Sequence, residues 1–131
     1  MKVAFASSDG LQVNQHFGQA TAFHIWEVQI DQAECVGRIE QAGRDIENED
    51  HILAKAQALE GCSIACSLQI GGPAAAKLVA RHIHPMKTNA ETPIAELVSK
   101  FQDVLRGNAP PWLAKAMGME PKRRFVETTD E

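Results

Sequence analysis

The sequence has no tyrosine, and aromatic side chains make up only 5% of its 131 residues. That leaves little material for the stacked aromatic surface on which single-stranded nucleic acids are held. Positive charge is not in excess either, since the formal net charge is −4. The one basic cluster, residues 122–124 (KRR), stands beside acidic residues and is typical of a solvated tail. We therefore expect no nucleic-acid partner.

Long apolar runs are also missing. None approaches the ~18 residues that a membrane-spanning helix needs, so we expect no membrane partner. Met1 and Lys2 lead directly into VAFA, which is too short for the core of a signal peptide. There are three cysteines, which cannot all pair within one chain. Without an export signal, a reduced, cytoplasmic setting is expected.

The pattern of apolar residues changes its period along the chain. The first part has short apolar blocks rich in β-branched and aromatic side chains, which predict strands. From residue 48 onward, apolar residues also recur at helical spacing, and glycine and proline mark the breaks. We predict strands over residues 2–6, 22–30, 34–41, 62–70 and 82–86, and helices over residues 48–60, 74–81 and 92–106.

The order of these segments predicts one α/β domain. Antiparallel strands come first and β-α-β units follow, which indicates a mixed sheet covered by helices on both faces. The length suits a single domain with a tail. We expect residues 1–118 to form the domain, including a C-terminal PPW segment at 110–112, and residues 119–131 to form a charged, mobile tail.

Ligands of open α/β sheets tend to bind outside the carboxyl ends of the parallel strands. The loop after the first strand, which carries His16, should lie there together with Gly71 and Gly72. The two glycines allow close approach of the backbone, and the start of the next helix favours anions. A plain strand-to-helix turn explains the glycine pair equally well.

The other histidines have simpler explanations. His24 lies inside a strand pattern and is expected to pack or hydrogen-bond within the sheet. His82 and His84 would share one face of a strand. His16 differs because it stands on a loop bordered by glycine, at the predicted ligand end of the sheet.

Two of the cysteines, Cys62 and Cys66, are four residues apart. In a strand this spacing separates them by ~13 Å, so they cannot chelate one small ion together. Either thiol remains able to contribute singly to a large cluster. With no CxxC pairs, neither a zinc knuckle nor a fixed four-cysteine iron–sulfur site is supported.

No arrangement of catalytic residues is visible. The strand at 2–6 carries no Asp or Glu, whereas metal-assisted hydrolysis needs a constellation of carboxylates. A P-loop, a GxGxxG motif and a catalytic triad are absent. We therefore predict that the protein is not an enzyme.

Four segments in order resemble the nitrogenase iron–molybdenum-cofactor biosynthesis family. They are MKVAFASSDGLQVNQHFG (1–18), IGGPAAAKLV (70–79), IHPMK (83–87) and NAPPWLAKAMG (108–118), and the last three are similar to its NifX-type branch. The resemblance implies a ribonuclease H-like, three-layer α/β/α fold with a mixed five-stranded sheet. It also implies that residues 1–118 form a cofactor-binding domain.

The function implied by this resemblance is that of a non-catalytic carrier. Such a protein transiently binds the iron–sulfur cofactor precursor of a NifB-type radical-SAM enzyme, or FeMo-cofactor, and passes it to a NifEN-type scaffold complex. The metal ligand implied is His16, and the further candidates for the binding site are Phe17, Gly18, Cys66, Cys62, Gly71 and Gly72. Two alternatives stay open: a regulatory or scaffolding module without its own cluster, and a ribonuclease H-like hydrolase.

Overall fold

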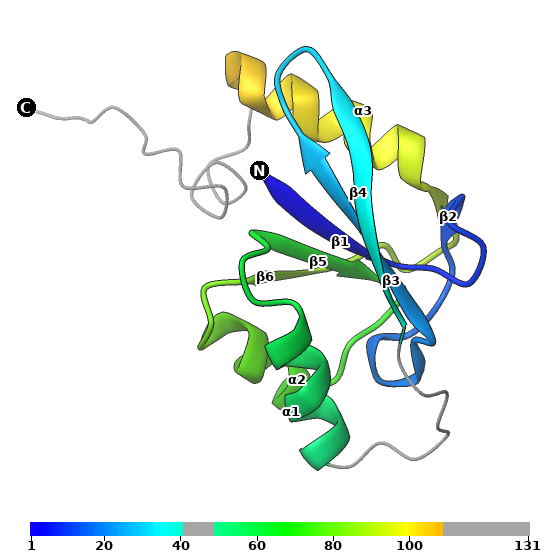
Figure 1. Ribbon diagram of the computed structural model, residues 1–131, viewed down its shortest axis with the longest axis vertical. Coiled ribbons are helices and arrows are strands. Elements are labelled where there is room, and N and C mark those ends of the chain that lie inside the picture. Colours follow the sequence, from blue (N-terminus) through cyan, green and yellow to red (C-terminus); the bar gives the residue numbers. More distant parts are fainter. Residues whose placement is uncertain (41–48, 109–131) are drawn as a thin grey trace, which may run out of the picture.

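The main sheet of the protein has five strands in the order β4-β3-β1-β5-β6. It is seen in a computed structural model that describes residues 1–40 and 49–108 (Figure 1). β1 pairs antiparallel with β3 and β3 with β4, whereas β1, β5 and β6 run parallel. The predicted mixed five-stranded sheet is therefore confirmed. Its strands are β1 (Lys2–Ala6), β3 (Ala22–Val28), β4 (Ala33–Glu40), β5 (Ile64–Ser67) and β6 (His84–Lys87).

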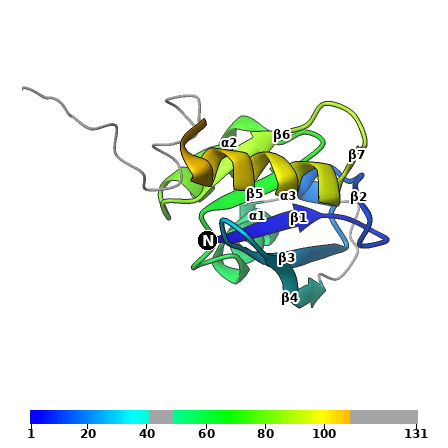
Figure 2. The same ribbon diagram turned by 90° about the horizontal axis from the view of Figure 1, so that it is seen from above.

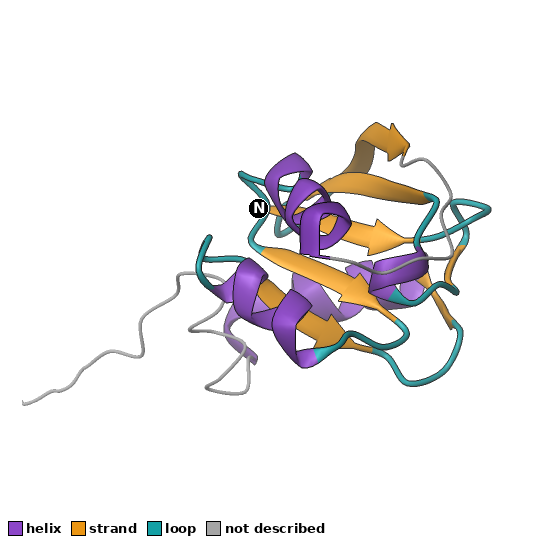
Figure 3. Cartoon of the chain, turned by 90° about the horizontal axis from the view of Figure 1, so that it is seen from below, coloured by secondary structure: helices purple, strands orange, loops and turns teal. Residues whose placement is uncertain are grey.

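Helices cover both faces of this sheet, as predicted. α3 (Ile94–Asp103) stands in front of the sheet in Figure 2, whereas α1 (Glu49–Ala58) and α2 (Gly72–Val79) stand in front of it in Figure 3, seen from the opposite side. None of the helices within residues 1–40 and 49–108 is long and apolar enough to cross a membrane.

The sequence of β1 explains why both faces are covered. Successive side chains of a strand point to opposite faces. Ala4 and Ala6 join the core under α1 and α2, and Val3 and Phe5 join the core under α3. A central strand that is apolar on both faces needs a layer of helices on each side.

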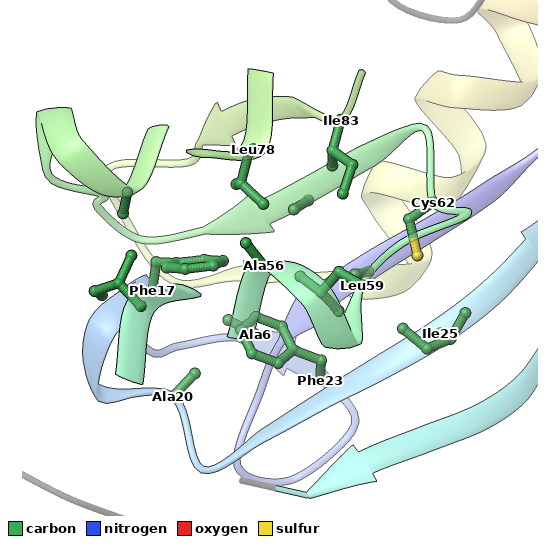
Figure 4. Close-up of a cluster of buried hydrophobic side chains, with 14 residues drawn as sticks. Ala6, Phe17, Ala20, Phe23, Ile25, Ala56, Leu59, Cys62, Leu78 and Ile83 are labelled. Carbon is green, nitrogen blue, oxygen red and sulfur yellow. The ribbon is translucent and has the colours of Figure 1, made fainter. Parts of the chain in front are cut away.

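The core under α1 and α2 contains side chains from the sheet, from both helices and from the loop that carries His16. Figure 4 shows its members Phe17, Phe23, Leu59 and Leu78 in one cluster. The rings of Phe17 and Phe23 lie 5.4 Å apart between centroids, at an angle of 51°. Phe17 comes from the loop after β1, so this loop is built into the core.

β5 is shorter than the strand predicted over residues 62–70. Cys62 belongs instead to the end of the α1 segment, where its N–H donates to the carbonyl of Leu59. At its carboxyl end β5 stops at Ser67, because the N–H of the next residue, Leu68, donates to the carbonyl of Gln15 in another loop. An apolar run shows that a segment is buried, but these backbone bonds decide where the strand stops.

The prediction that His82 and His84 share a strand face is wrong. His82 has φ 62°, and its N–H donates to the carbonyl of Val79 in the turn after α2. β6 begins only at His84. The left-handed backbone at His82 is a turn conformation, which histidine tolerates better than most side chains.

A small second sheet joins the loop after β1 to the start of α3. β2 (Gln12–Val13) pairs antiparallel with β7 (Thr92–Pro93). The N–H of Ile94 extends this contact by donating to Leu11 over 2.8 Å. The predicted PPW segment at 110–112 and the charged tail at 119–131 lie outside the described residues.

Candidate functional site

The loop that carries His16 is fastened to the loop that follows β5. The N–H of Leu68 donates to the carbonyl of Gln15, and the N–H of Phe17 donates to the carbonyl of Gln69, each over 2.9 Å. His16 stands between these two bonds, and its side chain is exposed. We call residues 15–21 the His16 loop and residues 68–71 the β5–α2 loop.

The base of the His16 loop is closed by a pair of side-chain contacts. The N–H of Thr21 donates to Oε1 of Gln15 over 3.0 Å, and Nε2 of Gln15 donates to Oγ1 of Thr21 over 3.1 Å. Between them, Phe17 is 1% exposed and packs in the core. These contacts hold the loop at both ends and in the middle, so the imidazole of His16 projects from a defined frame.

A buried lysine supports the same loop from α1. Nζ of Lys55 donates to the carbonyl oxygen of Gly18 over 2.8 Å, and Lys55 is only 3% exposed. Lysine is rarely this deeply buried, because removing an ammonium from water costs free energy unless it gains hydrogen bonds. Lys55 is not predictable from the sequence as a supporting residue, since nothing local distinguishes it from a surface lysine of a helix.

The two loops enclose an open pocket of about 250 Å³. Its walls come from His16, Gly18, Gln69, Ile70 and Gly71. Of the residues predicted for the site, the structure therefore brings His16, Gly18 and Gly71 together. Gly72 follows directly as the first residue of α2, and Phe17 lies beneath the loop as its anchor.

α2 begins directly after Gly71, a wall residue of the pocket. The first bond within the helix runs from the N–H of Ala75 to the carbonyl of Gly71 over 2.9 Å. The N–H groups of Gly72 and Ala74 precede it, while Pro73 has none, so these two have no acceptor within the helix. Such a helix start favours negative charge.

The glycines of this turn are not explained by the backbone. Gly71 has φ −76°, which any residue adopts. A Cβ on Gly72 would meet no atom within 4 Å, and one on Gly71 would meet only Cδ of Pro73, at 4.0 Å. Neither strain nor crowding requires glycine here, and Gly71 is the N-cap of α2, a position where glycine is common.

The structure does not bring the two cysteines to His16. Cys66 is 0% exposed in the core under α3, and burial raises the pKa of its thiol. Cys62 lies on the opposite face, in the core under α1 and α2, where burial also raises its pKa. Figure 4 shows Cys62 and Phe17 at opposite ends of that core. Buried, protonated thiols are poor metal ligands and nucleophiles.

The remaining histidines of the sheet do not line the pocket. The ring of His24 lies against Gly10, where a Cβ would come within 3.0 Å of Cε1. Burial, and secondly the charge of Arg38, lower the pKa of His24, while burial lowers the pKa of His84. His24 is thus a sheet residue, as its position in the sequence suggested.

Within residues 1–40 and 49–108, no three His, Cys, Asp or Glu side chains are grouped so as to hold a metal ion. His16 is the histidine among the residues that line the pocket.

Fold and pocket together define an α/β domain with an open pocket made by loops at the carboxyl ends of parallel strands. The model of the dinitrogenase iron–molybdenum cofactor family matches residues 1–104. The chain belongs to this family, and its relatives make it a NifX-type member.

Among these relatives, NifX of Rhodobacter capsulatus is 35% identical over 137 residues, which cover 100% of this chain and 86% of NifX. NifY of Azotobacter vinelandii is 36% identical over 125 residues, covering 95% of this chain. This chain matches only 51% of the length of NifY. The FeMo cofactor biosynthesis protein NifB of the same organism is 33% identical over 102 residues, which are 73% of this chain and 20% of NifB.

A similar fold occurs in the crystal structure of PH0822. It superposes with a TM-score of 0.63 over 79% of this chain and 90% of that one. The two sequences are 19% identical, so this likeness concerns the fold alone.

Proposed function

We propose that this protein is a non-catalytic carrier in the biosynthesis of the nitrogenase cofactor. It binds an iron–sulfur cofactor precursor of the NifB type, or FeMo-cofactor, in the pocket between the His16 loop and the β5–α2 loop. One observation carries the proposal: the exposed His16 lines one pocket together with Gly71, the residue directly before α2. The family name and the name of the relative NifB support the pathway.

The chemistry of the pocket suits a cluster that is handed on. Neutral imidazole is a good ligand for iron and is available near pH 7. The N–H groups of Gly72 and Ala74 offer hydrogen bonds to the sulfides of an anionic cluster. A single side-chain ligand, His16, is easier to replace during transfer than four cysteines. The buried Cys62 and Cys66 take no part in this site.

The proposal includes the partners and the setting. A NifB-type radical-SAM enzyme supplies the precursor, and a NifEN-type scaffold complex receives it, in the cytoplasm. We also assign the fold to the ribonuclease H-like class. That assignment is supported by the order β4-β3-β1-β5-β6, with three antiparallel strands followed by two parallel ones.

Anaerobic titration of the protein with isolated FeMo-cofactor tests the carrier function. We expect a stable complex that elutes with the protein in gel filtration and carries its iron. His16→Asn removes the imidazole but keeps a polar side chain, and we expect it to weaken binding by about tenfold or more, the equivalent of roughly 1.4 kcal/mol.

His82→Asn is the matched control. It replaces another exposed histidine, in the turn before β6, at the opposite end of the parallel strands. Asparagine tolerates the left-handed backbone at that position. Equal affinities of the two variants would remove His16 from the site. Binding of an assembly partner without any uptake of cofactor would favour the regulatory or scaffolding module instead.

A further inference from the structure

We propose that Gln69 is a second residue that contacts the bound cofactor, and that Asn89 positions its side chain. This inference rests on the proposed function and adds to it a polar contact on the wall opposite the His16 loop. Gln69 lines the same pocket as His16 and is only partly buried.

The backbone of Gln69 is held in place from two sides. Its carbonyl oxygen accepts the N–H of Phe17 over 2.9 Å and the hydroxyl of Ser67 over 3.1 Å. Ser67 is 1% exposed, so its hydroxyl donates this hydrogen bond from a buried position. The Cα of Gln69 therefore has little freedom, and its side chain starts from a fixed point beside the pocket.

The side chain of Gln69 is held as well. Its Nε2 donates to Oδ1 of Asn89 over 2.8 Å. Asn89 follows β6, and its own N–H donates to the carbonyl of Leu68 over 3.1 Å. Asn89 thus joins the loop after β6 to the β5–α2 loop, 20 residues earlier in the chain.

The backbone at Asn89 indicates that this contact is specifically arranged. Its φ is +63°, a left-handed conformation that few side chains other than asparagine adopt readily. Glycine would satisfy the backbone at lower cost, but it has no acceptor for Gln69.

The chemistry that Gln69 offers is that of a pre-positioned amide. A glutamine Nε2 carries two N–H groups, and one of them is used on Asn89. The second is available to an acceptor in the pocket, such as a sulfide or a carboxylate of an anionic cofactor. Because the side chain is already held, binding loses less rotamer freedom than it would with a free glutamine.

Titration with isolated FeMo-cofactor under anaerobic conditions tests the role of Gln69. Gln69→Ala is expected to weaken binding by about tenfold or more, the effect of one hydrogen bond to a charged acceptor. Gln69→Glu should weaken it further, because a carboxylate repels an anionic cofactor. Gln102→Ala is the matched control, since Gln102 also donates from Nε2, to the carbonyl of Gln29, but lies on α3.

A double-mutant cycle tests whether Asn89 acts through Gln69. Asn89→Gly keeps the left-handed backbone available and removes only the acceptor, so urea unfolding should match that of the unchanged protein. Affinity should fall about threefold, and the double variant with Gln69→Ala should bind no more weakly than Gln69→Ala alone. Additive losses, or unchanged affinity in Gln69→Ala, would overturn the inference.

The two proposals fail separately. If His16→Asn weakens binding and both Gln69 variants do not, the carrier function stands and the role of Gln69 falls. If the unchanged protein does not bind isolated FeMo-cofactor, both are overturned.

Discussion

The ammonium group of Lys55 donates a hydrogen bond to the carbonyl oxygen of Gly18 over 2.8 Å. This contact joins α1 to the His16 loop across 37 residues of sequence, and it is buried. It lies directly behind the pocket, since Gly18 forms part of the wall. The position of the imidazole therefore depends on a side chain that never reaches the pocket surface.

Replacing Lys55 with methionine should disturb both the loop and the fold. Lys55→Met keeps most of the side-chain volume but leaves the carbonyl of Gly18 without this donor, at a cost of about 1–3 kcal/mol. We expect that loss in the free energy of unfolding by urea, together with weaker binding of FeMo-cofactor. Lys100→Met is the control, because Lys100 is exposed and pairs with Glu96 on the surface of α3. Equal stability of the two variants would contradict the supporting role of Lys55.

Replacing Phe17 should lower both the stability of the fold and the affinity for cofactor, whereas replacing Phe101, in the core under α3, should lower stability alone. Phe17 and Phe101 are each 1% exposed, and each lies against a second ring, at 5.4 Å for Phe17 and 6.4 Å for Phe101. Leucine at either position should lower the free energy of unfolding by roughly 1–3 kcal/mol. Only Phe17→Leu should also weaken cofactor binding, because Phe17 anchors the His16 loop. A loss of affinity of the same size in Phe101→Leu would show that binding follows general stability.

The three cysteines should differ in their rates of alkylation. Cys35 is exposed, whereas Cys62 and Cys66 are buried. In the native protein, iodoacetamide should therefore label Cys35 first, as followed by mass spectrometry of peptides. Cys62→Ala and Cys66→Ala should each cost about 1 kcal/mol of stability for the cavity left behind. Their affinity for FeMo-cofactor should stay within about twofold of the unchanged protein, and a tenfold loss in either would make that thiol a ligand.

Stability should fall in mild acid. Burial lowers the pKa of both His24 and His84 in the folded protein, and Arg38 adds to the effect at His24. The unfolded chain, with histidine pKa values near 6.5, then binds more protons than the folded chain. The stability from these neutral histidines is present above pH 6.5 and is lost as the pH falls toward the folded pKa values.

Urea unfolding at pH 7.5, 6.5 and 5.5 tests the predicted loss of stability in acid. The urea concentration at the midpoint of unfolding should be lowest at pH 5.5. The variant His24→Leu should show a smaller decrease, because leucine takes up no proton in either state. The buried Nε2 of His24 has no hydrogen-bond partner among the described residues, so the substitution removes no hydrogen bond there. A pH dependence identical in the variant would contradict a role for His24.

Much of the fold follows from local sequence patterns. β1 spans the residues predicted for it, because VAFA is apolar on both faces and ends at a turn. Pro73 lies in the first turn of α2, where its fixed φ suits a helix start. The end of β5 was not predictable in this way, since Leu68 is as apolar as the strand but bonds to Gln15 in another loop.

The candidate site was only partly predictable, for the same reason. His16, Gly18 and Gly71 were found because a loop histidine and a glycine turn are visible in the sequence and the topology places them at one end of the sheet. Lys55 and Gln69 were not found, because their roles arise from contacts 37 and 20 residues away. Cys62 and Cys66 were candidates by residue type, and only the fold shows that they lie on opposite faces of the sheet.

The central claim is that the imidazole of His16 is a ligand of the bound cofactor. Pulsed electron paramagnetic resonance of FeMo-cofactor bound to the protein, with histidine labelled by ¹⁵N, measures this directly. We predict a hyperfine coupling from a coordinated histidine nitrogen that is present in the unchanged protein and in His82→Asn and is lost in His16→Asn. A bound cofactor that shows no histidine nitrogen coupling, or the same coupling in His16→Asn, would contradict the claim.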